Sequence, residues 1–272
     1  MDAVDVRNLS YAYEDENVLD NLTFKVREGE LVSILGPNGA GKTTLFLNLV
    51  GILKGKGEIK LFGRDVEKYD RKELSKTINM VFQNPDDQLF MPTVFDDIAF
   101  GLINLGYEDV EGRVEMILKK FGLEDFRDRY PHHLSFGEKK KVAIASVVSL
   151  DPKILLLDEP TANLDPISRD ELIRIIEDLN REGMTIIIAT HDTELALKSD
   201  RVMILNRRIV GEGSPKEIFS DLSLLKENGL DAPQIVKLFL KLGLEVPRDV
   251  EEAVEIIKNY LRIGPTSSKP CL

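Results

Sequence analysis

Cysteine is almost missing from this sequence, which has one, Cys271, in 272 residues. A single thiol excludes a disulfide within the chain and fits a reducing compartment. The sequence also has no apolar run near the roughly 20 residues that a membrane-spanning helix needs. No basic and then apolar leader occurs at Met1–Arg7. We therefore expect a chain that stays in the cytoplasm and has no membrane span of its own.

Positive charge is in deficit. The chain has 36 Lys and Arg against 47 Asp and Glu, a formal net charge of −11, with the acidic residues spread along its length. This balance disfavours a general nucleic-acid binder but is compatible with local phosphate sites. A hydrophobic content of 43% and a charged content of 31% are typical of a soluble globular protein.

A glycine-rich segment is the most informative motif. Residues 36–43 read Gly-Pro-Asn-Gly-Ala-Gly-Lys-Thr, the phosphate-loop pattern, between the apolar run Leu31–Leu35 and a helix predicted over Lys42–Val50. This order directs free N–H groups at the start of a helix toward a polyphosphate. An ordinary glycine-rich turn is the alternative, which the strand and helix disfavour. The predicted nucleotide-binding residues here are Gly36, Pro37, Asn38, Gly39, Ala40, Gly41, Lys42, Thr43 and Thr44.

Two side chains of this loop have separate chemical tasks. The Lys42 ammonium can reach the β- and γ-phosphates, and the Thr43 hydroxyl can coordinate the Mg²⁺ that accompanies a nucleotide. We therefore expect the chain to bind a nucleoside triphosphate with Mg²⁺.

A second phosphate-chemistry motif is the apolar run Ile154–Leu157 followed by Asp158 and Glu159. A carboxylate at the end of a strand beside a phosphate loop is suited to Mg²⁺, which predicts that role for Asp158. Glu159, one position on, is predicted to accept a proton from the attacking water. A capping or surface acid is the alternative, and the phosphate loop upstream favours catalysis.

The apolar pattern predicts an α/β fold. Short apolar runs at 154–157, 185–189 and 202–205, separated by helical patterns such as 168–182, indicate a buried and mostly parallel sheet. Alternation at 4–9 and 22–26, with a further strand at 57–62, indicates an N-terminal antiparallel β subdomain. The segment 83–150 is mostly helical, with helices predicted at 111–121 and 138–148. The predicted division is 1–214 for the main domain, with a helical subdomain at about 84–150, then 215–262 for a helical extension and 263–272 for a flexible tail.

Further segments resemble the ATP-binding cassette (ABC) ATPases. Leu134–Glu138 reads Leu-Ser-Phe-Gly-Glu, similar to the family's Leu-Ser-Gly-Gly-Gln signature. The other matches, in family order, are Tyr13 for the aromatic that stacks on adenine, Gln83 for the Q-loop, Asn163–Asp165 for the D-loop and His191 for the switch histidine. The resemblance spans Leu9–Gly213 and implies a P-loop NTPase core of the RecA-like type.

The resemblance also implies a mechanism that uses two chains. Such cassettes pair head to tail, so that ATP held by Lys42 of one subunit is covered by Ser135 and Gly137 of the other. Asp165 would couple the two sites across the interface.

Within one site, the resemblance implies that Thr43, Gln83 and Asp158 hold Mg²⁺. Glu159 would then activate water, and His191 would contact the γ-phosphate.

The signature departs from the family pattern at two positions. Phe136 replaces the first glycine and Glu138 replaces the glutamine. These changes reduce backbone flexibility and bring an anionic side chain near the start of the helix, but Gly137 is retained. We expect activity to survive.

Two other polar groups are expected to have no catalytic or metal-binding role. His132 and His133 resemble a metal pair, but adjacent residues point in different directions, and we expect a loop role. The run Lys139–Lys141 is expected to be solvated on one face of a helix.

The stretch Gln83–Phe90 resembles the ATPase subunits of energy-coupling-factor importers, the group for cobalt, nickel and vitamins, as do 134–145 and the tail past Pro215. The resemblance implies that the chain works in a homodimer or a related heterodimer. This dimer would act peripherally at the cytoplasmic face of the membrane, together with integral-membrane components. Two groups of apolar residues each allow two interpretations. Leu89, Phe90, Val94, Phe95 and Phe100 either line a groove for a partner's coupling helix or pack internally, and Ile235, Leu238, Phe239 and Leu242 either cover the core or form a dimer patch.

The predicted function is therefore ATP hydrolysis that drives a membrane importer, with no role for nucleic acid. The alternative is a soluble, non-transport ABC ATPase of the translation or DNA-repair type. Translation types carry two cassettes and repair types carry a long coiled coil, but this chain has one phosphate loop and no sustained heptad. A non-catalytic nucleotide-binding regulator would be favoured if Glu159 were missing. The guanine motif Asn-Lys-x-Asp is absent, and the nearest string, Glu67–Asp70, lacks the amide.

Overall fold

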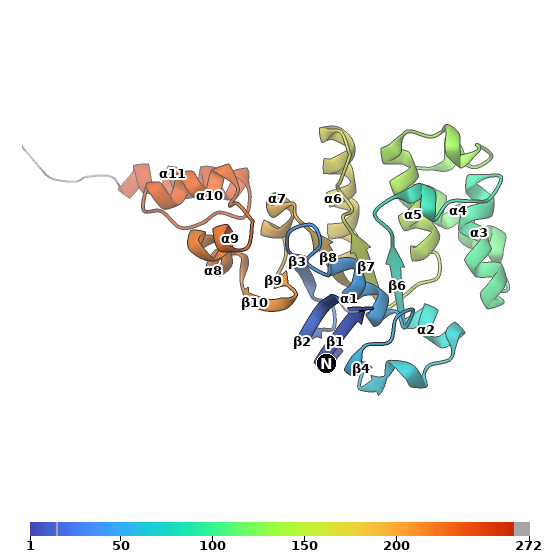
Figure 1. The fold of residues 1–272 in the computed structure, drawn as a ribbon. Coiled ribbons are helices and arrows are strands. Elements are labelled where there is room, and N and C mark those ends of the chain that lie inside the picture. The colour runs from blue at the N-terminus through green and yellow to red at the C-terminus, as the bar shows by residue number, and fades with distance from the viewer. Residues whose placement is uncertain (15, 264–272) are drawn as a thin grey trace, which may run out of the picture.

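The computed structural model describes residues 1–14 and 16–263. The predicted flexible tail lies outside the described residues except for Ile263, and so does Cys271. The described strands form two sheets, with a group of helices at each end of the molecule (Figure 1). The predicted α/β class, with an antiparallel and a mostly parallel sheet, is confirmed.

The N-terminal sheet has the strand order β2-β1-β4-β5, and its neighbours are antiparallel. Its members are β1 (Asp2–Tyr13), β2 (Glu16–Arg27), β4 (Lys56–Leu61) and β5 (Arg64–Asp65). Alternate residues of β1, among them Val4 and Val6, are buried and pack toward the second sheet. β1 and β2 extend beyond their apolar residues because their pairing continues as far as Tyr13 and Glu16.

The central sheet has the order β10-β9-β3-β8-β7-β6. Its strands are β3 (Leu31–Leu35), β6 (Ile78–Val81), β7 (Ile154–Asp158), β8 (Thr185–Thr190), β9 (Arg201–Asn206) and β10 (Arg208–Gly213). The strands β3, β6, β7, β8 and β9 are parallel, and β10 is antiparallel to β9. Every residue of β3, β7 and β8 is buried, which is why these strands read as continuous apolar runs.

Helices cover both faces of the central sheet. α1 (Lys42–Leu49) lies between the two sheets, where Leu45, Phe46 and Leu49 join the core. The other face carries α6 (Pro166–Arg181) and α7 (Thr193–Leu197), which contribute Leu172, Ile176 and Leu195 to a second core.

The helical subdomain lies at one end of the central sheet, beside β6 (Figure 1). It contains α3 (Val94–Leu105), α4 (Val110–Phe121) and α5 (Phe136–Val148), joined by short 3₁₀ turns at 124–126 and 131–133, the second holding both histidines. α2 (Arg71–Thr77) precedes β6, and further 3₁₀ turns lie at 66–68 and 85–87.

The expectation of a solvated lysine run in α5 is wrong at its centre. Lys140 is fully buried, with 0% of its surface exposed. Its neighbours lie nearer the surface, where Lys139 pairs with Asp86 and Lys141 pairs with Glu171. The helical period turns the middle lysine toward the central sheet, which the charge run alone did not reveal.

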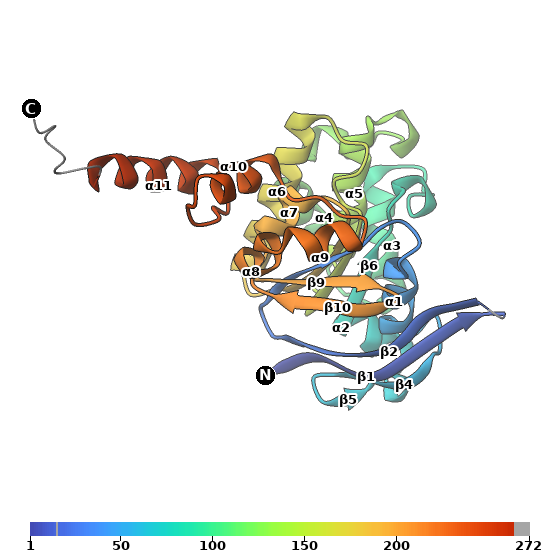
Figure 2. The same ribbon diagram turned by 60° about the vertical axis from the view of Figure 1, so that its left-hand side comes forward.

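The C-terminal extension lies at the opposite end, beyond β9 and β10. It consists of α8 (Pro215–Ser220), α9 (Leu222–Glu227), α10 (Gln234–Lys241) and α11 (Val250–Ile263). Phe219 and Val236 pack against the edge of the central sheet. Figure 2 shows α11 projecting away from the rest of the molecule.

Candidate active site

The phosphate loop connects β3 to α1 at the carboxyl end of the central sheet. Gly41 begins α1 with φ +98°, a left-handed conformation that disfavours other residues. Gly36 is needed for a different reason, because a Cβ there would lie 2.3 Å from the Leu205 carbonyl oxygen. The loop is therefore held against the neighbouring strand β9 as well as against its own helix.

Lys42 is buried beneath the loop and turned toward its own backbone. Its Nζ donates to the carbonyl oxygens of Gly36 at 2.6 Å and Pro37 at 3.2 Å. The same Nζ lies 3.3 Å from Glu159 Oε1, close enough for an ion pair but outside hydrogen-bond geometry. One buried ammonium thus faces both the phosphate loop and the carboxylate that ends the second motif.

Asp158 and Thr43 meet as the sequence predicts. The Thr43 hydroxyl donates to Asp158 Oδ2 at 2.6 Å, and Asp158 is buried at the end of β7. Burial raises the pKa of the Asp158 carboxyl above its usual range. Its Oδ1 has no hydrogen-bond partner in the described part of the chain. A hydroxyl oxygen beside a buried, unsatisfied carboxylate oxygen is a donor set that fits Mg²⁺.

Glu159 is held from several sides in a strained conformation, with φ +43°. Its Oε2 accepts hydrogen bonds from the Thr190 hydroxyl at 3.0 Å and from the His191 backbone N–H at 3.3 Å. His191 Nδ1 lies 3.0 Å from the same oxygen, while the rest of the imidazole is largely exposed. The structure therefore brings Glu159, His191 and Lys42 together.

Lys42, Asp158 and Glu159 line a cleft of about 510 Å³ that also includes Gln83, whereas His191 is not among its described lining residues. The described cleft takes Pro37–Thr44 from the phosphate loop and both carboxylates from β7. Glu16 and Val18 of β2 line it too, although the sequence analysis did not select them. Nothing in the alternating pattern of β2 marks them, and they reach the cleft because β2 passes beside Gly41.

The other predicted site residues lie outside this cleft. Tyr13 is half-exposed at the end of β1 and contacts the edge of Tyr11, with ring centroids 4.9 Å apart. Asp165 begins α6 and accepts hydrogen bonds from Ser168, whose hydroxyl lowers the pKa of the Asp165 carboxyl. The adenine and interface roles of these residues stay predictions.

The signature residues form the start of α5. Ser135 caps this helix, and the Glu138 carboxylate accepts hydrogen bonds from the Ser135 N–H and hydroxyl, both at 2.7 Å. The acid at position 138 therefore completes a capping box. Gly137 packs so closely on α6 that a Cβ would lie 2.7 Å from Ser168 Oγ.

Asp192 is a structural residue that the sequence analysis missed. It caps α7 directly after His191 and accepts hydrogen bonds from the Arg169 guanidinium at 2.9 and 3.1 Å and from the Thr161 hydroxyl at 3.0 Å. It therefore ties the loop that carries His191 to α6. The sequence could have indicated this role, because an Asp directly before a short helical pattern is typical of a helix cap.

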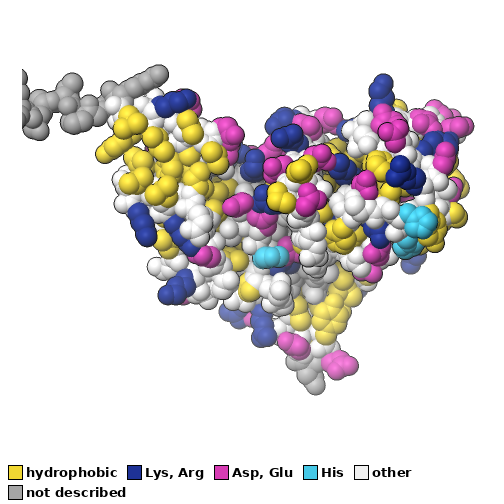
Figure 3. Space-filling model, turned by 90° about the horizontal axis from the view of Figure 1, so that it is seen from above, with side chains coloured by type: hydrophobic (Ala, Val, Ile, Leu, Met, Phe, Trp, Pro, Cys, Tyr) yellow, Lys and Arg dark blue, Asp and Glu magenta, His cyan; other side chains and the backbone are white. Residues whose placement is uncertain are grey.

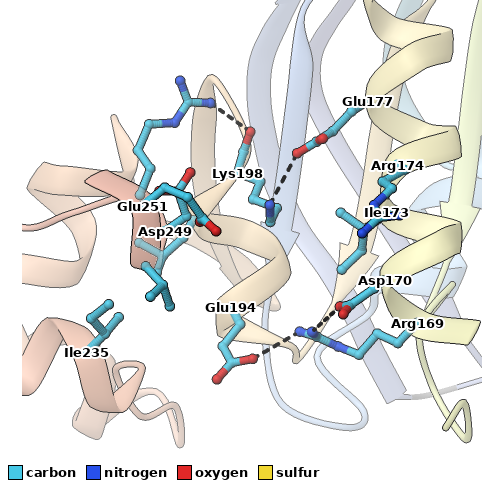
Figure 4. Close-up of a pocket in the computed structure, with 13 residues that line it drawn as sticks. Arg169, Asp170, Ile173, Arg174, Glu177, Glu194, Lys198, Ile235, Asp249 and Glu251 are labelled. Carbon is cyan, nitrogen blue, oxygen red and sulfur yellow. Dashed lines mark hydrogen bonds and ion pairs between the residues drawn. The ribbon is translucent and has the colours of Figure 1, made fainter. Parts of the chain in front are cut away.

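A second pocket, of about 540 Å³, lies between α6 and α7 on one side and the C-terminal extension on the other (Figure 4). Lys198 pairs with Glu177, and its carbonyl oxygen accepts a hydrogen bond from Arg248 at 3.0 Å. Charges of both signs line this pocket, and none of the predicted site residues does. It is a contact region between the extension and the helices that support the site.

The chain is similar to known proteins over most of its length. Residues 19–162 match the family described as ABC transporter, which is more than half of the chain. The chain belongs to the ABC transporter family. It is similar to the energy-coupling factor transporter ATP-binding protein EcfA of Methanocaldococcus jannaschii, with 48% identity over 95% of this chain and 98% of the relative. The EcfA protein of Carboxydothermus hydrogenoformans is 45% identical over 95% and 98% of the two chains.

Two solved ABC structures share the fold. One is cbiO1 from Clostridium perfringens, described as part of the ABC transporter complex cbiONQ, with a TM-score of 0.74, 39% identity and coverage of 83% of this chain and 94% of that one. The other is an ATP-binding cassette in a dimeric, post-hydrolysis state with ADP and Pi, with a TM-score of 0.70, 28% identity and coverage of 78% and 98%. The chain is thus an ABC ATPase of the energy-coupling factor type. Its membership of this family confirms the predicted ATP-hydrolysing activity.

No helix among residues 1–14 and 16–263 has the length and hydropathy to cross a membrane.

Proposed function

We propose that this chain hydrolyses ATP as one half of an ATPase dimer that drives an importer for cobalt, nickel or a vitamin, at the cytoplasmic face of the membrane. The observation that carries the proposal is the joining of Lys42, Asp158 and Glu159 in one buried cluster at a complete phosphate loop. The similarity to EcfA proteins and to cbiO1 supports the importer and its cargo class.

Each residue of the cluster has a proposed task. Lys42 leaves its two carbonyl partners to bind the terminal phosphates of ATP. Glu159 accepts the proton of the attacking water, and His191 orients the γ-phosphate from its exposed position beside Glu159.

Thr43, Asp158 and Gln83 are the proposed holders of Mg²⁺, which supplies charge neutralisation at the phosphates when bound. The unsatisfied Asp158 Oδ1 and the adjacent Thr43 hydroxyl support this assignment.

The position of the signature supports a dimer. Ser135 and Gly137 lie at the start of α5 and do not line the chain's own cleft. We propose that each covers ATP held by a second ATPase subunit, as the dimeric solved relative supports.

The extension gives this dimer a second contact. Hydrophobic side chains gather on the surface of α10 and α11 in Figure 3. Leu238 of α10 and Leu242, which directly follows that helix, are about half-exposed, and the exposed residues of α11 include Val250, Tyr260 and Leu261. Phe239, by contrast, is buried in the core. Of the predicted apolar group, Phe239 therefore covers the core, while Leu238 and Leu242 remain available for a dimer contact.

The residues predicted to line a groove for a membrane partner are partly buried in the core and partly exposed. Leu89 and Val94 are buried in the core, and Phe95 is partly buried beneath the Arg127 guanidinium. Phe90 and Phe100 remain exposed, at 62% and 42%, and meet edge to face with centroids 4.9 Å apart. We propose that this aromatic pair receives an apolar helix of the integral-membrane component.

Substitution of the exposed aromatic tests the importer proposal. We expect Phe90→Asp to leave the fold and basal ATPase intact, because its side chain is outside the cleft, and to abolish recovery of the membrane partner. The reason is that an unpaired carboxylate buried at an apolar contact costs several kcal/mol. The measurement is a pull-down of the tagged chain from detergent-solubilised membranes of its host, with a circular-dichroism melt.

Met116→Asp is the matched control, because Met116 is an equally exposed apolar residue on α4. Undiminished partner recovery with Phe90→Asp, or an equal loss with both variants, would refute this docking surface.

A further inference from the structure

Lys140 is the largest polar side chain buried without a task in the scheme above. It is fully buried on α5, about one helical turn after Phe136, and its Nζ lies 6.0 Å from the centroid of the Phe136 ring. Its Nζ donates to the Glu159 carbonyl oxygen at 3.3 Å and to the Phe82 carbonyl oxygen at 3.4 Å. Phe82 directly precedes Gln83. One ammonium therefore contacts the backbone of the proposed base and the backbone beside a proposed Mg²⁺ ligand.

The charge of Lys140 belongs to the same cluster as the catalytic carboxylates. Burial lowers the pKa of Lys140 to about 8, and the charges of Asp158 and Glu159 act in the opposite direction. Lys140 is therefore mostly charged at neutral pH. With Lys42, it supplies one of two buried cations that face the two buried acids.

Stability alone does not explain this lysine. Removing an ammonium from water is costly, and an apolar residue of similar shape often packs as well or better. Among the described residues, no carboxylate lies within ion-pair distance of Lys140, so its direct partners are two carbonyl groups. What Lys140 adds, and a Met would not, is a donor and a positive charge.

The backbone of Glu159 shows why a donor is useful there. Glu159 has a positive φ, which a non-glycine residue keeps only when its surroundings hold it. Its N–H donates to the Ala189 carbonyl oxygen at 2.8 Å, and its carbonyl oxygen accepts from Lys140. The strained peptide is thus fixed on both sides, by β8 and by the signature helix.

We propose that Lys140 is a positioning residue for ATP hydrolysis, which holds the backbones of Glu159 and Phe82 against α5 through its two hydrogen bonds to their carbonyl oxygens. The inference rests on the proposed role of Glu159 as the base. It gives the signature helix a contact with the cleft of its own chain, separate from any contact with a second subunit.

The test compares Lys140→Met with Lys141→Met, its neighbour on α5, whose partner Glu171 lies on α6. We expect Lys140→Met to lower kcat roughly tenfold or more while the KM for ATP stays within about twofold. Lys141→Met is expected to match the unsubstituted chain. The assays are steady-state ATPase, equilibrium ATP binding and a thermal melt.

The comparison of kcat with KM separates positioning from a general loss of structure. Lys140→Met removes the donor to the Glu159 carbonyl oxygen and leaves Lys42 in place, so we expect hydrolysis to slow while ATP binding is kept. Lys140→Gln, which keeps a side-chain donor, is expected to recover part of the lost kcat.

Unchanged kcat in Lys140→Met overturns the proposal, and so does a loss of kcat with a parallel rise in KM, the absence of any recovery in Lys140→Gln, or an equal loss in Lys141→Met. If Lys140→Met melts below the assay temperature, Lys140→Leu gives the same comparison of kcat with KM. Full turnover by Glu159→Gln would remove the base assignment, whereas the kcat comparison at Lys140 would still report on that lysine itself.

Discussion

The contact between Gly137 and Ser168 allows a prediction about stability that is independent of nucleotide. In the family mechanism this glycine approaches a phosphate on another subunit. The structure shows a second reason for it, because a Cβ at position 137 would lie 2.7 Å from Ser168 Oγ and 2.8 Å from Ser168 Cβ. Real Cβ atoms do not approach so closely, so either α5 or α6 must shift in Gly137→Ala.

The magnitude follows from two opposing effects. Overpacking of a closely packed contact typically costs about 1–3 kcal/mol. Replacing Gly by Ala inside a helix returns up to about 1 kcal/mol of helix propensity. The net expectation is a loss of about 1–2 kcal/mol in the free energy of unfolding, which lowers Tm by roughly 2–8 °C for a chain of this size.

A double-mutant cycle with Ser168→Gly isolates the contact. Ser168→Gly alone loses the 2.6 Å hydrogen bond to Asp165, but it removes both atoms that a Cβ at position 137 would meet. We expect the double variant to be more stable than the sum of the single losses by about 1–2 kcal/mol. The assay is denaturant unfolding in nucleotide-free buffer. A coupling energy near zero, or a Gly137→Ala chain as stable as the parent, would refute the packing argument.

Two further predictions concern the carboxylates. Glu159→Gln is expected to bind ATP and nearly stop hydrolysis, because it keeps the cradle and loses the base; steady-state turnover near normal would sink the assignment. Asp158→Asn is expected to stabilise the nucleotide-free chain near pH 7 and to lose that advantage as the pH falls. The folded pKa of Asp158 is raised by burial, so its carboxyl favours folding below its unfolded pKa, near 3.8, and loses that contribution as pH rises through the folded value. Thermal melts from pH 3.5 to 8 check this, and a gap between variant and parent that widens toward low pH would contradict it.

The motifs that follow buried strands were predictable because parallel strands read as short apolar runs and end at one edge of the sheet. β3 has the predicted bounds, and Asp158 lies beside Thr43 as the two motifs require. β10 was not predicted, because it is a half-exposed edge strand with charged and glycine residues rather than an apolar run.

Side-chain burial was harder to predict where charge hides periodicity. Three successive lysines look like a solvated surface, yet the middle one is fully buried because a neighbouring strand end offers carbonyl groups to it. The roles of the apolar residues at 89–100 were left open for the same reason, since residue type alone does not say which of them meet the core. Such distinctions depend on tertiary packing, which one sequence does not encode in any local pattern.

The phosphate loop, Asp158 and Thr190 follow or end β3, β7 and β8, three adjacent strands whose residues are all buried. The exposed apolar residues proposed for partners lie on and just before α3 at one end of the molecule, and on and next to α10 and α11 at the other (Figure 1). Chemistry and recognition thus occupy separate parts of the structure. We therefore expect substitutions on the outer helices to alter partner binding and to leave the catalytic centre intact.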